Sequence, residues 1–242
     1  MRTLIWVAVA AALAAGCVPD GGAATPESAP YLCRTKTGVK ISVDGKLEEP
    51  LWRASTPMPV IRAALGRGEV QATVVFLGWD KTSLYAAFLC ADADVQLHRA
   101  SVARDGEIGF DDRVGLALKA PGSERIACFE ISAAGSLLDY LAIGAGGALD
   151  PKAFSHKGVR AAVVQTADGY TVELAVPWEA LGRVGLSAPL AGAELAASAY
   201  RSDMNVVGGR MREIRSLWRA PGARGSAFQA KGAFGTVRLI SE

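Results

Sequence analysis

The chain has 242 residues, with 26 lysine and arginine residues against 24 aspartate and glutamate residues and a formal net charge of +2 at pH 7. Proteins that bind nucleic acid carry a strongly basic face, so this balance gives no reason to expect a nucleic acid partner. The chain has two histidines, and its four cysteines do not follow the spacing of zinc ligands. These residues indicate neither a metal centre nor an assembled catalytic group, and we expect that the protein is not an enzyme.

Residues 1–17 are typical of a lipoprotein signal peptide. A positively charged start precedes an apolar run over residues 4–13, which is too short for a stable membrane anchor, and small residues then lead to Cys17. This ending resembles the bacterial lipobox, although Ala14 stands where leucine is usual. We expect an exported protein with lipid on Cys17 as its membrane anchor, and Val18 after the cysteine favours the outer membrane. The alternative is an ordinary signal peptide with a chance cysteine.

A flexible linker is predicted over residues 18–32, because small, polar and proline-rich sequence cannot bury enough surface to fold. No comparable segment interrupts residues 33–242, which we expect to form one domain. This domain contains Cys33, Cys90 and Cys128. The last two lie in apolar strand sequence, where a free cysteine behaves as a small hydrophobic residue, so we favour buried thiols over a disulfide.

A short strand, a tight turn and a helical turn are predicted over residues 41–52. Ile41 and Val43 alternate with polar residues, and the Asp-Gly pair that follows favours a turn with positive φ. Pro50 suits the first position of a helical turn that carries Trp52. Together these features predict a lid that buries the tryptophan against a β-sheet.

Strand signals recur through the rest of the chain, as alternating or continuous apolar runs bounded by turn residues. The predicted strands are residues 70–79, 84–91, 113–119, 126–132, 159–165, 170–176, 194–200 and 235–240. A helical turn over residues 177–182 is expected to begin at Pro177 and to end at Gly182. Eight short strands with a few short helical turns predict an all-β fold, an antiparallel β-sandwich.

Several short motifs follow one another in a fixed order between Val39 and Leu239. They are VDGKLEEPLW at residues 43–52, Trp79-Asp80, Leu84-Tyr85, Asp92, Asp112, the run from Gly169 to Gly182, and Phe234-Gly235. In this order they resemble the family 9 carbohydrate-binding modules. The resemblance implies a β-sandwich that binds glycan without catalysis.

The resemblance also implies where a sugar would bind. Members of the family clamp a sugar ring between two tryptophan faces, while polar side chains on the adjacent sheet face contact its hydroxyls. The clamp positions fall near Phe110 and at Phe228, and the polar positions fall at Gly115 and Glu130. Gly115 is small enough to leave room for a ring, and Arg113 flanks the same face. Phe110, Arg113, Glu130 and Phe228 are therefore candidate ligand-binding residues.

Each candidate also has a structural interpretation. Arg113 and Glu130 are also consistent with a cross-strand ion pair, and Phe228 with a residue that plugs the end of the sandwich. Trp218, a further ligand candidate, is more often a core residue than a binding platform.

An arginine-rich segment surrounds Trp218. Residues 201–224 contain six arginines against Asp203 and Glu213, which predicts a solvated loop that could meet an acidic polysaccharide. Elsewhere, Asp92 and Asp94 offer oxygens of the kind that calcium prefers, but two carboxylates are too few to predict a site. We expect no cofactor.

Three functional classes remain open. The first is an envelope lipoprotein that binds carbohydrate, and the second is a structural or accessory envelope lipoprotein that uses the sandwich for protein contacts. The third is a haem-binding electron-transfer domain. Met204, Met211, His98 and His156 supply residue types that ligate haem, although the sequence has no haem attachment motif.

Overall fold

The structure of the protein is a computed structural model. It describes residues 29–35, 38–60, 62–66, 68, 70–98, 104–144, 155–186, 189–219 and 231–242. The predicted signal peptide with Cys17, most of the predicted linker, and Phe228 lie outside the described residues. Within these ranges, no helix has the length and apolar character needed to cross a bilayer.

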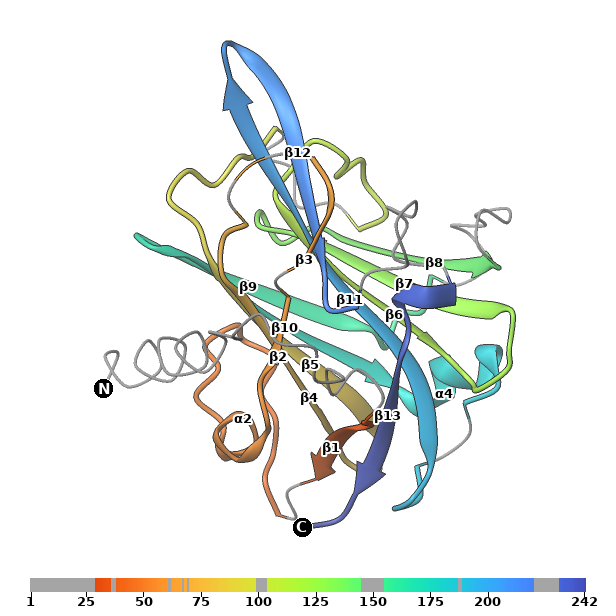
Figure 1. The fold of residues 1–242 in the computed structure, drawn as a ribbon. Coiled ribbons are helices and arrows are strands. Elements are labelled where there is room, and N and C mark those ends of the chain that lie inside the picture. Colours follow the sequence, from red (N-terminus) through yellow and green to blue (C-terminus); the bar gives the residue numbers. More distant parts are fainter. Residues whose placement is uncertain are drawn as a thin grey trace, which may run out of the picture.

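The described strands pair into one thirteen-stranded sheet that folds back on itself (Figure 1). The strands are β1 (Tyr31–Thr35), β2 (Met58–Pro59), β3 (Arg62–Leu65), β4 (Thr73–Trp79), β5 (Ser83–Ala91), β6 (Arg113–Lys119), β7 (Arg125–Ser132), β8 (Leu137–Ile143), β9 (Arg160–Thr166), β10 (Gly169–Pro177), β11 (Glu194–Val207), β12 (Arg210–Leu217) and β13 (Gly235–Ile240). The short helices are α2 (Pro50–Ala54), α4 (Trp178–Leu181), η1 (Gly182–Val184) and η3 (Lys231–Ala233).

The two halves of the sheet form the layers of a sandwich. The main path runs β8-β7-β6-β11-β13-β1-β4-β5-β10-β9, while β12 pairs with β11 and β3, and β2 pairs with β4. Val114 and Phe129 from the first half share one buried cluster with Phe88 and Leu174 from the second. The predicted all-β sandwich is therefore confirmed, and most of the predicted strands form.

Strand β1 corrects two expectations. It begins at Tyr31, inside the predicted linker, and it runs parallel to both β13 and β4, so the sandwich is not purely antiparallel. The Tyr31 side chain is buried in the main core, and its hydroxyl donates to the carbonyl of Thr56 and accepts from the backbone N–H of Leu77. Through β1 the two layers join along one side of the sandwich.

The predicted lid is confirmed, apart from its strand. Ile41 and Val43 lie in chain that pairs with no strand, whereas Gly45 adopts the positive φ of 80° that the turn requires. Helix α2 begins at Pro50 and buries Trp52 in a second core cluster on the outer face of β4, β5 and β10. The helical turn after β10 is also present, capped by Pro177 and Gly182 as predicted, and a 3-10 turn continues it to Gly185, whose φ is 81°.

The expectation of a solvated loop over residues 201–224 is wrong for its first part. Strand β11 continues to Val207, and β12 returns along it to form a hairpin. The two residues at its turn, Gly208 and Gly209, have positive φ values of 60° and 73°, which a two-residue hairpin turn demands. Figure 1 shows this hairpin reaching beyond the sandwich. The three predicted thiols of the domain are buried and free.

Candidate functional site

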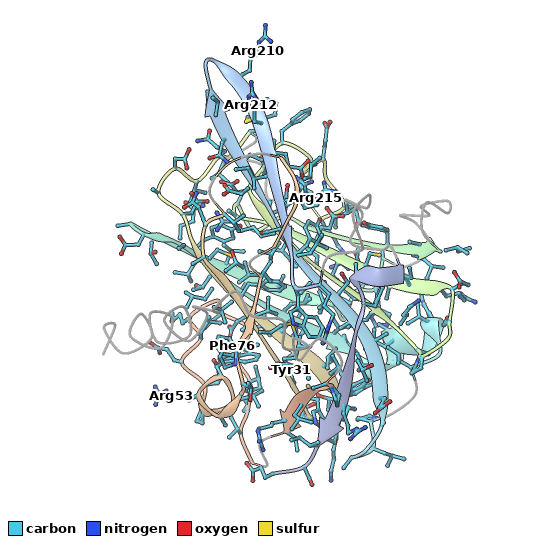
Figure 2. All side chains as sticks on the ribbon, viewed as in Figure 1. Tyr31, Arg53, Phe76, Arg210, Arg212 and Arg215 are labelled. Atoms are coloured by element: carbon cyan, nitrogen blue, oxygen red, sulfur yellow. The ribbon has the colours of Figure 1, made fainter. Side chains whose placement is uncertain are left out.

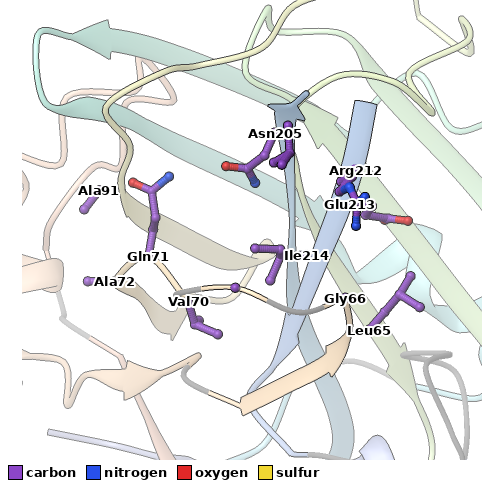
Figure 3. A pocket seen from close by; sticks show the side chains of 12 residues that line it. Leu65, Gly66, Val70, Gln71, Ala72, Ala91, Asn205, Arg212, Glu213 and Ile214 are labelled. Atoms are coloured by element: carbon purple, nitrogen blue, oxygen red, sulfur yellow. The ribbon is translucent and has the colours of Figure 1, made fainter. Parts of the chain in front are cut away.

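An open pocket of about 950 Å³ lies along the β11–β12 hairpin, and its lining reaches Val207, the residue before the turn. Its described lining combines aliphatic residues with four polar ones, Gln71, Asn205, Arg212 and Glu213. Figure 3 shows Gln71 on one wall, with Arg212 and Glu213 on the hairpin strand across from it.

The strand register shows which hairpin side chains share the pocket face, and it places the side chain of Glu213, which pairs with Met204, on the opposite face. Residues directly opposite on paired strands point to the same face, as do residues two apart along one strand. Asn205 pairs with Arg212 and Val207 pairs with Arg210, so all four share a face. A side chain on Gly66 would overlap the carbonyl oxygen of Glu213, and glycine there lets the chain after β3 approach β12.

A network of charged side chains lies on the opposite face of the hairpin from the pocket. Arg113 pairs through Nε with Glu130 at 3.3 Å and through Nη2 with Glu213 at 3.1 Å, and its Nη1 donates to the carbonyl of Gly109 at 2.9 Å. Arg215 pairs with the same Glu213 oxygen at 2.6 Å. Arg113 and Glu130 therefore form the cross-strand ion pair that the sequence offered as the alternative to ligand binding.

Glu213 is the centre of the network. Burial opposes the ionisation of this carboxylate, but a hydrogen bond from Ser202 and the charges of Arg215 and Arg113 outweigh it and lower its pKa. Glu213 is therefore a firmly held anion rather than a free acceptor. Sequence reasoning missed this role, because Glu213 and Arg113 are 100 residues apart.

The expected space over Gly115 is filled. A side chain added at Gly115 would overlap the ring of Tyr200, which lies directly opposite on β11 and is buried. The guanidinium of Arg215 lies 5.6 Å from the centre of that ring. The prediction that Gly115 leaves room for a sugar ring is therefore wrong, because a cross-strand tyrosine occupies the space.

The remaining predicted ligand residues lie in different places. Phe110 is 50% exposed and packs its ring 5.4 Å from that of His98. Trp218 meets Tyr31 edge-on at 6.3 Å and packs against the main core, and it is not among the described pocket-lining residues. Phe228 lies outside the described residues.

A second charged cluster lies behind the pocket. Carboxylate oxygens of Asp92, Asp112 and Asp203 all lie within 4.8 Å of one another, and all three residues are buried. Arg201 pairs with Asp92 at 2.7 Å and with Asp203 at 3.6 Å. Gln71, on the pocket wall, donates weakly to the same two aspartates at 3.5 and 3.4 Å.

The cluster balances its charge in two ways. Arg201 supplies one positive charge. Burial also raises the pKa of Asp112 to about 7, although the backbone N–H groups of Met204 and Gln96 donate to its carboxylate and oppose this rise. Carboxylate oxygens are ligands that calcium accepts, and the trio differs from the Asp92 and Asp94 pair considered from sequence. Asp94 contributes only a backbone N–H, which donates to Asp92.

Comparisons with known proteins show the fold. No family model matches the sequence, and no curated protein matches it either. A candidate carbohydrate-binding protein from Bacteroides uniformis is similar in structure, with a TM-score of 0.67 and 13% identity over 86% of this chain and 97% of that one. A family 9 carbohydrate-binding module from Caldicellulosiruptor kristjanssonii, in complex with cellotriose, has a TM-score of 0.63 and 12% identity over 88% of this chain and 95% of the module. The complex of such a module from that organism with glucose gives a TM-score of 0.62 and 13% identity, over 87% and 96% of the two chains.

The chain therefore has the fold of the family 9 carbohydrate-binding modules. The motif order from Val43 to Phe234 predicted this fold, and the motif tryptophans are its framework. Trp52 and Trp178 are buried, and the Trp178 indole N–H donates to the carbonyl of Asp80 at 2.9 Å.

Proposed function

We propose that this chain is a carbohydrate-binding protein that holds a glycan without altering it, and that the glycan lies in the pocket along the β11–β12 hairpin. The observation that carries the proposal is a polar-lined pocket of about 950 Å³ at one end of a sandwich with the family 9 fold. The C. kristjanssonii modules of that fold are in complex with cellotriose and glucose, which are carbohydrates.

The pocket walls suit a sugar because their polar groups are positioned before a ligand arrives. The amide nitrogen of Gln71 is directed at Asp92 and Asp203, and that of Asn205 donates to the carbonyl of Asp203. This leaves the amide oxygen of Gln71 to accept from a sugar hydroxyl. Ordering such groups in advance reduces the entropy lost on binding.

The ligand candidates predicted from sequence take two roles in this proposal. Arg113 and Glu130, whose side chains are 7% and 12% exposed, position Glu213 rather than contact the glycan. Phe110 is half exposed, but it is not among the described residues that line the pocket, and this proposal gives it no contact with the glycan. Trp218 packs with β1 and supports the core.

The proposed location is the cell envelope, with lipid on Cys17 as the anchor. Figure 1 shows β1 and the hairpin tip at opposite ends of the molecule. Leu32 on β1 and Glu194 at the start of β11 both lie opposite Arg238, and from there β11 extends about 40 Å to Val207 at the usual rise per residue. A protein tethered before β1 would therefore present the pocket away from its anchor.

The test is a glycan array probed with the full chain, purified in a detergent that carries no sugar. We expect binding to at least one glycan class, and calorimetry on that glycan should show about fivefold weaker affinity for Asn205→Ala, the effect of losing one hydrogen bond. Thr236→Ala, at an exposed position on β13, is the matched control and should bind as the wild type does. Absence of binding to every glycan would refute the proposal.

A second function is favoured by one observation. Val206, Val207 and Met211 are exposed near the hairpin tip, and apolar side chains at a projecting tip suit a protein contact. The test places a crosslinker at Met211 and, as the control, at Arg53. If no glycan binds, and only the crosslinker at Met211 captures one defined envelope protein, the chain is an accessory envelope protein instead.

A further inference from the structure

Two arginines project from the pocket face of the hairpin. Arg212 lines the pocket, and Arg210 lies on the same face of β12, two residue pairs nearer the turn. Both are exposed, and Figure 2 shows them at the projecting end of the hairpin. They are the charged groups that a ligand entering the pocket from solvent would meet first.

These two guanidinium groups differ from the other arginines around the site. Arg113, Arg201 and Arg215 are each ion-paired to a carboxylate. In the described part of the chain, neither Arg210 nor Arg212 has a hydrogen bond or an ion pair. Their charge is therefore uncompensated on the pocket face.

The nearby carboxylates do not cancel this charge. Glu213 already accepts from Arg113, Arg215 and Ser202. Asp92 and Asp203 are buried behind Gln71, where Arg201 pairs with both. The free cations at the pocket mouth thus face solvent, while the acids are held inside the protein.

The apolar part of the lining also limits the kind of sugar that fits. Neutral sugars bind well where aromatic faces pack against their C–H groups, and the described lining contains aliphatic side chains but no aromatic one. A guanidinium group instead forms paired, charge-assisted hydrogen bonds with carboxylate or sulfate oxygens. The lining thus has the groups that bind an anionic sugar.

We propose that the pocket takes a sugar unit that carries a carboxylate or a sulfate group, so that the ligand is an acidic glycan. This inference rests on the proposed function and names the ligand class of the same pocket. Arg212 contacts the anionic group inside the pocket, and Arg210 contacts the next charged unit of the glycan toward the tip.

Three oligosaccharides test the proposal by calorimetry with the full chain. Oligogalacturonate carries carboxylates only, dextran sulfate oligosaccharide carries sulfates only, and cellotriose is neutral. We expect one or both charged ligands to bind at least about tenfold more tightly than cellotriose, and added salt to weaken that binding. The two charged ligands show which anionic group is recognised.

Three charge-removing variants then locate the site. Arg212→Gln and Arg210→Gln should each weaken binding of the charged ligand, the first by about tenfold, as expected for loss of a charge-assisted hydrogen bond. Arg53→Gln removes the same charge from exposed α2, at the other end of the molecule in Figure 2, and should bind as the wild type does.

Two outcomes separate this inference from the function on which it rests. Tightest binding to cellotriose, with no effect of Arg212→Gln, would overturn the acidic ligand and leave carbohydrate binding intact. Failure of every glycan on the array would overturn both. Equal weakening by Arg53→Gln and Arg212→Gln would show a general charge effect and overturn the assignment to the pocket.

Discussion

The Arg201 guanidinium is buried more deeply than any other arginine in the described chain. Its side chain is 1% exposed, and it lies among three aspartates while its Nη1 donates to the carbonyl of Ala91 at 2.5 Å. A charge can be buried this far only where opposite charge and hydrogen bonds replace the water it leaves. Arg201 thereby holds the start of the hairpin against the end of β5.

Replacement of Arg201 by methionine should lower the free energy of unfolding by about 3–5 kcal/mol at neutral pH, because Asp92 and Asp203 would be left buried without their cation. Urea denaturation measures this loss. Arg210→Met is the control, since an exposed arginine without a partner should change stability by no more than about 0.5 kcal/mol. Equal losses in the two variants would contradict the assigned role of Arg201.

The scale of single residues was the hardest to predict from sequence. Arg201 and Arg212 are both arginines in one polar segment, yet one is buried and the other is exposed at the pocket. Burial of Arg201 depends on Asp92, which is more than 100 residues away in the chain. Local sequence carries no signal for a partner at that distance.

Among the elements, the lid is held by a buried carboxylate. Glu173 on β10 accepts from the indole N–H of Trp52 at 2.8 Å and from the backbone N–H groups of Asp44 and Gly45. Desolvation nevertheless raises the pKa of Glu173 from 4.5 to about 7, with Glu49 adding a smaller repulsion. The carboxyl group of Glu173 therefore takes up a proton at a higher pH in the folded lid than in the unfolded chain.

This raised pKa makes stability depend on pH. Between about pH 4.5 and pH 7 the folded state binds more protons at Glu173 than the unfolded state, so the free energy of unfolding should fall as the pH rises through that range. One such proton contributes at most about 1.4 kcal/mol per pH unit. Glu173→Gln keeps an acceptor but cannot titrate, and it should make this dependence shallower.

Urea midpoints measured from about pH 5 to about pH 8 test the lid. Asp112 also has a pKa raised to about 7 and should contribute in the same direction, so Asp112→Asn is the comparison that separates the two groups. If both variants keep the full pH dependence of the wild type, these carboxylates ionise alike in the folded and unfolded states.

Elements were predicted well where their own residues determine them. The hairpin of β4 and β5 and that of β9 and β10 follow from apolar runs separated by short turns. Strand β12 was missed because its sequence, Arg210 to Leu217, is mostly polar, and it becomes a strand by pairing with β11. Strand formation there is set by the neighbour rather than by propensity.

At the scale of the whole molecule, β1 joins the layers and marks the end at which a tether would attach. We expect the mature protein to begin at Cys17 and to carry acyl chains there, because small residues precede that cysteine after an apolar run. Mass spectrometry of membrane-extracted protein measures the new N-terminus and the added mass. Cys17→Ser should release the protein or leave the signal uncleaved, whereas a soluble wild-type product cut elsewhere would contradict the prediction.

The sequence by itself determined the sandwich class, the lid around Trp52 and the buried thiols. Periodicity, turn residues and ordered motifs can be read from the chain without knowing which segments pair with one another. Only the tertiary structure decided the pocket. More than 130 residues separate Gln71 from Arg212 on the opposite wall, and Tyr200 fills the space that Gly115 was expected to leave. Which polar side chain is buried and which faces a ligand depends on pairing across the sheet, and strand register is fixed only when the whole sandwich closes.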